Sequence, residues 1–327
     1  MKGKHKIVIQ SKRVKFELTV KRNITIIRGD SATGKTTLVS MINQYYEEGE
    51  ASGIILHCDK KCVVLEGKKW EAVLSTITDS IVFIDEGNKF VSSKEFSGAI
   101  QHTDNYYVII SRETFSTLPY SINEILGFKT SDKYANVKQI YNEAFNLYQG
   151  LTAKTITEPT LIITEDSKAG GQFFSSLGIR CVHAGGKSNI IKHLYNIDND
   201  EVLIVADGAA LGSEIDTIMK EIKVHKNITL YAPESFEWLL LKADLFENGN
   251  EIKAVLDNPA DFIDSKKYFS WERFFTAYIV SITTNLENNN IMLGYKYPSS
   301  KDKLPDVYIT PRVRDKILAV IPKLKLK

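Results

Sequence analysis

The stretch Ile24–Thr37 reads ITIIRGDSATGKTT, and it decides how the first half of the chain folds. Its isoleucines predict a buried strand, after which Gly29, four further residues and Gly34-Lys35-Thr36 complete the pattern G-x-x-x-x-G-K-[ST]. The glycines let the backbone aim its N–H groups at an anion, and a helix expected from about Lys35 adds its positive end. This pattern predicts a loop that binds nucleotide phosphates. The alternative is a chance glycine turn before a helix.

The predicted ligands of this loop are ATP and Mg²⁺. We expect the Lys35 ammonium to reach the β- and γ-phosphates as a catalytic group, and the Thr36 hydroxyl to ligate Mg²⁺. The expected nucleotide contacts come from the whole loop, namely Gly29, Asp30, Ser31, Ala32, Thr33, Gly34, Lys35, Thr36 and Thr37.

A second motif follows 50 positions after Lys35, where the apolar run Ser80–Ile84 ends in Asp85-Glu86. A continuous apolar run predicts a strand buried on both faces, whose carboxyl end presents side chains to a ligand. The run resembles a Walker B motif, which implies that Asp85 holds Mg²⁺ and Glu86 orients the attacking water as a catalytic residue. An ordinary strand and turn is the alternative.

The next expected strand, Tyr106–Ile110, ends at Ser111-Arg112, which either senses the γ-phosphate or is a solvated strand end.

Composition predicts a soluble globular protein of two domains. The chain has 327 residues, 43% hydrophobic and 25% charged, with a net charge of +2, so it lacks a globally basic surface for nucleic acid. We expect no secretory signal and no membrane span, because no apolar run approaches the roughly 20 residues a bilayer requires.

Three cysteines indicate a reducing cytoplasm rather than a disulfide scaffold. Cys58 and Cys62 either flank a turn or belong to a zinc site that lacks a fourth ligand.

Hydrophobic periodicity supplies the remaining elements of the first half. Alternation over residues 7–20 predicts an antiparallel strand pair, and the apolar spacing of Thr36–Tyr46 predicts a helix packed on a sheet. Short strands flank the Cys58–Cys62 turn, and Trp70–Ile77 and Lys133–Tyr148 are predicted helices. The polar stretch Thr152–Pro159 is predicted to connect the two domains.

The strand pair before the loop, the GKTTL sequence and the apolar run ending in Asp85-Glu86 resemble ATPases of the ABC superfamily. No LSGGQ-like signature precedes Asp85, however, and the interval is too short for the usual helical insertion. We therefore do not expect the head-to-tail dimer of that superfamily. We expect a minimal, divergent ATPase instead.

Strands and helices alternate again from Thr160, which predicts a second parallel sheet. The chain is therefore predicted to be an α/β protein of two domains, each a mainly parallel sheet with flanking helices. Residues 1–151 form the predicted nucleotide-binding domain, and residues 152–327 form the second domain with a helical extension at its end.

The order of motifs in Thr160–Leu241 resembles the Toprim domain of topoisomerases, primases and the OLD family of ATPase–nucleases. Glu165 follows the first strand of this region, Gly185-Gly186-Lys187-Ser188-Asn189 follows the second, and Asp207 with Gly212 follows the third. The resemblance implies that Glu165 and Asp207 are catalytic and hold Mg²⁺ where strand ends converge, so that the metal stabilises charge on a phosphodiester. Together with the first half, it reproduces the OLD-type order.

The chain departs from this pattern at Ala209, where the family has a second acid. Glu214, Glu234 or Glu237 could replace the missing metal ligand, and Glu237 is the preferred candidate. Three readings stay open for this half: a Toprim-like nuclease, a Toprim-like domain that binds without cleaving, and another α/β domain. His183 and Lys187 either contact phosphate or have no role in binding. In the second case His183 is a strand-end residue and Lys187 lies on the surface.

The segment Ser265–Ser281 carries six aromatic residues, which either stack nucleic-acid bases or belong to the core. The leading functional hypothesis is a cytoplasmic ATPase coupled to a Toprim-like domain that acts on or senses DNA or RNA, and the resemblance implies a defence nuclease or its regulator. The alternative is an ATP-dependent assembly or regulatory module whose second domain binds a protein partner or forms a homo-oligomer. A small-molecule kinase is a third class, which Asp85-Glu86 disfavours because the pair is suited to activating water.

Overall fold

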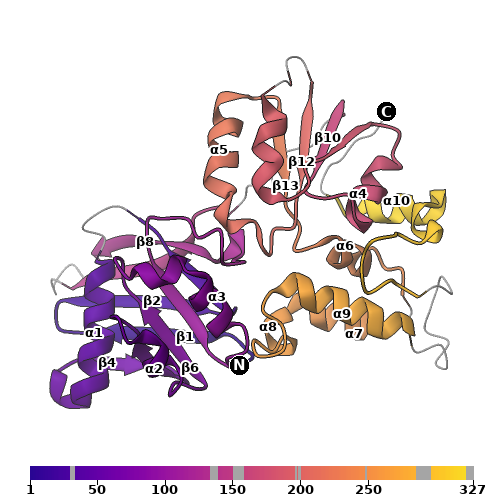
Figure 1. Cartoon of the computed structure of the whole chain (residues 1–327). Helices are drawn as coiled ribbons and strands as arrows, with labels where there is room; N and C mark the ends of the chain where they lie inside the picture. The colour runs from indigo at the N-terminus through magenta and orange to yellow at the C-terminus, as the bar shows by residue number, and fades with distance from the viewer. Residues whose placement is uncertain are drawn as a thin grey trace. The chain divides into compact units, whose positions relative to one another are not determined.

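A computed structural model describes residues 1–29, 34–132, 139–149, 158–195, 197, 200–246, 249–284 and 296–321 (Figure 1). The chain divides into two compact units. Unit 1 comprises Met1–Tyr148 and Ala260–Ser270, and unit 2 comprises Gln149–Pro259 and Trp271–Lys327. The loop residues 30–33, the domain boundary predicted near residue 152 and the basic tail 322–327 lie outside the described residues.

Unit 1 is built on a nine-stranded, mainly parallel, curled sheet in the order β4-β1-β2-β9-β8-β3-β7-β6-β5. Its strands are β1 (His5–Gln10), β2 (Val14–Val20), β3 (Ile24–Ile27), β4 (Ile55–His57), β5 (Lys61–Val64), β6 (Ser80–Ile84), β7 (Tyr106–Ile110), β8 (Ile125–Asp132) and β9 (Ile140–Asn146). Its helices are α1 (Lys35–Glu48), α2 (Trp70–Leu74) and α3 (Lys94–Ile100), with 3₁₀ turns at Gly49–Ser52, Lys89–Ser92 and Ile122–Glu124.

One hydrophobic core of unit 1 lies between α1 and the curled sheet. Leu38, Met41 and Ile42 of α1 are buried in one cluster with residues from β1, β2, β3, β6 and β7. Strands β1 and β2 pair antiparallel, as the alternation in sequence predicts. Helix α1 covers the predicted Thr36–Tyr46 and extends to Glu48, where Gly49 takes a positive φ of 59° that stops the helix.

The structure corrects one prediction in this unit. Residues 140–146 form strand β9 rather than part of a helix, and residues 133–138 of the predicted helix lie outside the described part of the chain. Strand β9 pairs antiparallel with β8 and parallel with β2, so ladders on both sides satisfy its backbone groups. Asn142 is buried and accepts a hydrogen bond from the Thr130 hydroxyl at 2.7 Å. These long-range pairings outweigh the local sequence that was interpreted as a helix.

A distant segment completes unit 1. The backbone N–H of Ser265 donates to the Met1 carbonyl, and the amide of Asn23 donates to the Ser265 carbonyl at 3.0 Å. The terminal ammonium also donates to the Ser265 hydroxyl at 2.8 Å. Residues 260–270 therefore pack beside the start of the chain although they are remote in sequence.

Unit 2 is built on a four-stranded parallel sheet in the order β11-β10-β12-β13. The strands are β10 (Leu161–Thr164), β11 (Arg180–His183), β12 (Val202–Val205) and β13 (Ile228–Tyr231). The helices are α4 (Ala169–Ser175), α5 (Ile215–Val224), α6 (Phe236–Lys242), α7 (Gly249–Asp257), α9 (Trp271–Thr284) and α10 (Pro311–Ala319), and α8 (Pro259–Phe262) leads into residues 260–270. There are 3₁₀ segments at Lys187–Leu194, Leu211–Ser213 and Asp306–Ile309. The α/β class and the parallel second sheet are confirmed.

The aromatic residues near α9 divide between burial and partial exposure. Trp271, Phe274 and Phe275 are buried, which favours the core interpretation for these side chains. Tyr278 stacks on Phe274, with ring centroids 5.7 Å apart.

Within the described residues, no helix combines the length and apolar character that crossing a membrane requires.

Candidate functional site

The phosphate-loop motif of unit 1 lies between β3 and α1. Gly34 precedes α1 with a left-handed φ of 77°, and a Cβ at this position would stand 3.0 Å from Cζ of Phe16. Both facts explain why this position requires glycine. The Lys35 side chain is buried, and its ammonium donates a hydrogen bond to the Gly29 carbonyl at 2.8 Å. This hydrogen bond joins the start and the end of the motif. Residues 30–33 lie outside the described part, so the loop is described only at its two ends.

The structure places the second motif at the same sheet edge as this loop. Strand β7 pairs parallel with both β3 and β6, so the carboxyl ends of all three strands share one edge. Neighbouring strands are about 4.8 Å apart, so the ends of β3 and β6 are about 10 Å apart, within the span of a nucleotide triphosphate and its ion. Ser111 follows the strand between them. The predicted position of Ser111, at the tip of the strand beside Asp85-Glu86, is therefore confirmed.

A cavity of about 110 Å³ opens at the ends of β6 and β7, where Asp85, Glu86 and Ser111 contribute to its lining. The Asp85 carboxylate accepts the Glu86 backbone N–H at 2.8 Å, which fixes the turn after the strand. Arg112 forms an ion pair with Glu86 at 3.3 Å, and both side chains are exposed. This ion pair holds the Glu86 carboxylate at the cavity rim.

Unit 2 brings two of its predicted acids together. Glu165 follows β10 and Asp207 follows β12, and these strands are parallel neighbours with Thr164 opposite Val205. The Asp207 backbone N–H donates to Oε2 of Glu165 at 3.3 Å. Burial is the main reason why the pKa of Glu165 rises to about 7. Burial and the neighbouring charge of Glu272 also raise the pKa of Asp207 well above its ordinary value.

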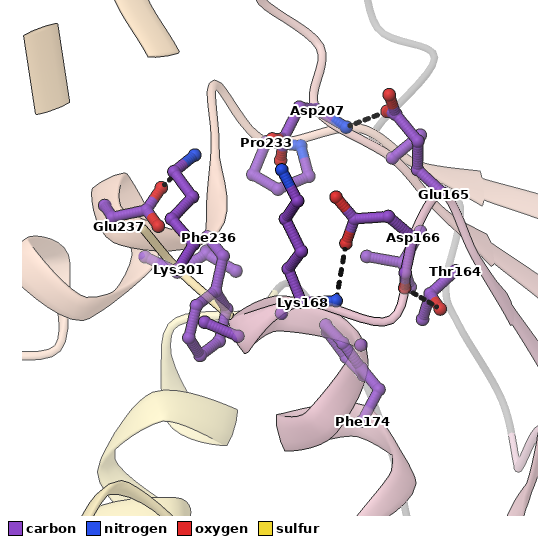
Figure 2. A pocket seen from close by; sticks show the side chains of 16 residues that line it. Thr164, Glu165, Asp166, Lys168, Phe174, Asp207, Pro233, Phe236, Glu237 and Lys301 are labelled. Carbon is purple, nitrogen blue, oxygen red and sulfur yellow. Dashed lines mark hydrogen bonds and ion pairs between the residues drawn. The ribbon is translucent and has the colours of Figure 1, made fainter. Parts of the chain in front are cut away.

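These acids border a cavity of about 40 Å³, which Figure 2 shows in close-up. Glu237, the third predicted acid, lines the same cavity from the first turn of α6 and is only 1% exposed. Its Oε1 accepts the Tyr297 hydroxyl at 2.8 Å, and its Oε2 lies 3.2 Å from the Lys301 ammonium. The structure thus gathers Glu165, Asp207 and Glu237 around one cavity, with a lysine beside the last of them.

Sequence reasoning missed two members of this cluster. Glu272, in the first turn of α9, lies 2.8 Å from the Lys301 ammonium. Burial opposes the charge of Lys301, but Glu237 and Glu272 raise its pKa above the ordinary value. Lys301 belongs to no motif, and an acid in the first turn of a helix is common. No local sequence signal distinguishes either residue.

The other candidate residues of unit 2 have different partners. Glu214 accepts a hydrogen bond from the Ser188 hydroxyl at 3.2 Å. Neither Glu214 nor Glu234 lines the cavity. His183 contacts the hydroxyls of Thr164 and Ser175 at the end of β11, as expected for a strand-end residue. Lys187 is half-buried rather than on the surface. It donates to the Ala210 carbonyl at 2.8 Å, and burial lowers its pKa.

The acid cluster of unit 2 does not match a ready-made metal site. Among the described residues, no group of three or more His, Cys, Asp or Glu side chains is arranged to hold a metal ion. Ala209, two residues after Asp207, is buried and offers no ligand. The Lys301 ammonium already lies between Glu237 and Glu272.

Cys58 directly follows β4 and Cys62 is the second residue of β5, so the two thiols flank the turn between these strands, as predicted. The hydrogen bond with Cys62 lowers the pKa of Cys58, while the same contact and burial raise the pKa of Cys62. These strands form the two opposite edges of the curled sheet although only three residues separate them in sequence.

No protein-family model and no curated protein matches the chain.

Proposed function

We propose that unit 1 binds and hydrolyses ATP. The observation that supports this proposal most is the common sheet edge shared by the Lys35 motif, Asp85-Glu86 and Ser111. Parallel strands that end together place a phosphate-binding helix terminus and a pair of carboxylates around one ligand. Neither motif alone would be sufficient support for ATP binding and hydrolysis.

Each residue has a defined task in this proposal. The α1 N-terminus and the Lys35 ammonium bind the phosphates, and Lys35 exchanges its bond to the Gly29 carbonyl for bonds to phosphate oxygens. Glu86 orients the attacking water, with its carboxylate held by Arg112. Ser111 is positioned to contact the terminal phosphate.

The donor chemistry of this site fits Mg²⁺. The Thr36 hydroxyl in the first turn of α1 and the Asp85 carboxylate are hard oxygen ligands of the type that Mg²⁺ prefers. Bound with the nucleotide, Mg²⁺ would neutralise charge on the phosphates.

The test is steady-state ATP hydrolysis by the full chain. Glu86→Gln should reduce kcat by at least about a hundredfold while ATP still binds, because the change removes a water-orienting carboxylate but no phosphate contact. Lys68→Ala, at an exposed lysine of the same unit, serves as the control and should retain activity. Turnover that is unchanged in Glu86→Gln would refute the assignment of Glu86.

For unit 2 we propose a Toprim-like domain that senses nucleic acid without cleaving it. The replacement of the second acid by Ala209 and the placement of Lys301 among the acids favour binding over cleavage. The alternative of a protein partner rests on the same two observations. In either case the ATP state of unit 1 would regulate unit 2.

Binding and cleavage are measured separately. Fluorescence anisotropy with single-stranded DNA, duplex DNA and RNA should show saturable binding of at least one of them. Incubation of the same substrates with Mg²⁺ or Mn²⁺ should leave them intact. Cleavage that is lost in both Glu165→Ala and Asp207→Ala would replace this proposal by a nuclease, and failure to bind any nucleic acid would favour a protein partner.

A further inference from the structure

Lys301 occupies the centre of the acid cluster in unit 2. Its ammonium lies 2.8 Å from a carboxylate oxygen of Glu272 and 3.2 Å from one of Glu237, and its side chain is 15% exposed. Figure 2 shows the Lys301 ammonium beside the Glu237 carboxylate at the cavity. Two carboxylates that converge on one point from α6 and α9 create the position that a cation would take.

The backbone around Lys301 is fixed by several hydrogen bonds. The Lys301 carbonyl accepts the Ala169 N–H at 3.0 Å, at the start of α4. Gln172 of the same helix donates to the Asp302 carbonyl at 2.7 Å and accepts the Leu304 N–H at 2.9 Å. This segment is therefore held on α4 at the lysine and at Asp302 and Leu304 after it.

Lys301 also has a left-handed backbone conformation, with φ of 60°. This conformation costs a lysine about 1 kcal/mol, and it persists only where surrounding contacts compensate for it. The hydrogen bonds to α4 and the two ion pairs are such contacts. The strained conformation and the buried ammonium therefore belong to one arrangement that directs the lysine into the cluster.

The buried Glu237 carboxylate requires a compensating positive charge. The Lys301 ammonium lies 3.2 Å from Glu237 and 2.8 Å from Glu272, so both carboxylates stabilise its charged form. A buried carboxylate without a partner costs several kcal/mol, so the cluster would be unstable without compensation. A tethered ammonium provides this compensation at a fixed local concentration, whereas a free divalent ion would have to displace it.

We propose that Lys301 is a built-in cation, whose ammonium takes the position of a divalent ion between Glu237 and Glu272. Unit 2 then balances its acids without a metal, and replacing Lys301 by a neutral residue converts the cluster into a divalent-cation site. This inference concerns the acid cluster alone and does not rest on ATP hydrolysis by unit 1.

The test is Mn²⁺ binding to the nucleotide-free full chain, followed by electron paramagnetic resonance. All proteins carry Asp85→Asn, which removes the carboxylate proposed to hold Mg²⁺ in unit 1, so that this site does not contribute. Lys301→Met should bind Mn²⁺ at least about tenfold more tightly than the Lys301 parent. Lys303→Met, at an exposed lysine on the same segment, is the matched control and should behave like the parent.

Thermal unfolding gives a second readout that does not require a stable variant. Mn²⁺ should raise the Tm of Lys301→Met, or restore its fold if the variant is unfolded without metal, and should leave the Tm of the parent unchanged. Failure of Mn²⁺ to bind or rescue Lys301→Met would overturn the proposal. So would a saturable Mn²⁺ site in the parent that disappears in Glu237→Gln.

Discussion

The burial of Glu165 predicts a specific pH dependence of stability. Its pKa is raised from the ordinary value of 4.5 to about 7, mainly by desolvation. A raised pKa means that folding favours the protonated carboxyl, so the stabilisation is fully present below pH 4.5 and is lost as the pH rises through about 7. At about 1.4 kcal/mol per pH unit, the loss amounts to about 3 kcal/mol.

Glu165→Gln removes this titration while preserving the shape of the side chain. Relative to the parent, the variant should therefore gain up to about 3 kcal/mol in free energy of unfolding between pH 4.5 and pH 7.5, because only the parent loses stability over that range. Glu201→Gln, at an exposed carboxylate of the same unit, is the control.

Urea unfolding followed by tryptophan fluorescence provides the assay. The chain has three tryptophans, and a Trp70→Phe background leaves only the two in unit 2, Trp238 and Trp271. A difference between Glu165→Gln and the parent that stays constant across this pH range would refute the reasoning, because it would show that Glu165 does not take up a proton on folding.

Three further substitutions have expected outcomes. Gly34→Ala should weaken ATP binding by about tenfold in calorimetry, because Ala is strained at a φ of 77° and its Cβ would crowd Phe16. Tyr297→Phe should lower the free energy of unfolding of unit 2 by about 1–3 kcal/mol, because the buried Glu237 carboxylate loses a hydrogen bond; no change in urea midpoint would contradict this. Ser235→Ala should cost about 1 kcal/mol in the same urea assay, because its side chain caps α6.

Sequence predicted those parts of the structure that depend on local patterns. The strands of Ile24–Ile27 and Ser80–Ile84 are continuous apolar runs, and helix α1 follows a glycine that the motif requires, so each was predictable from its own residues. The placement of Glu165 and Asp207 at one sheet edge also follows, because both come directly after parallel strands.

Features that depend on distant partners were not predictable. Strand β9 exists because β2 and β8 pair with it, and its own sequence gives no clear alternation. Residues 260–270 join unit 1 through backbone hydrogen bonds to Met1 and Gly3, which no side-chain pattern reveals. Lys301 and Glu272 meet Glu237 across large sequence separations, so only the fold shows that these charges belong together.

The most direct test of the account is isothermal titration of the full chain with ATP and Mg²⁺. We predict one saturable site that Lys35→Ala abolishes and Lys68→Ala preserves, because only Lys35 lies in the phosphate-binding motif at the end of β3. Absence of binding to the parent protein, or equal binding by Lys35→Ala, would contradict the assignment of unit 1 as a nucleotide-binding unit.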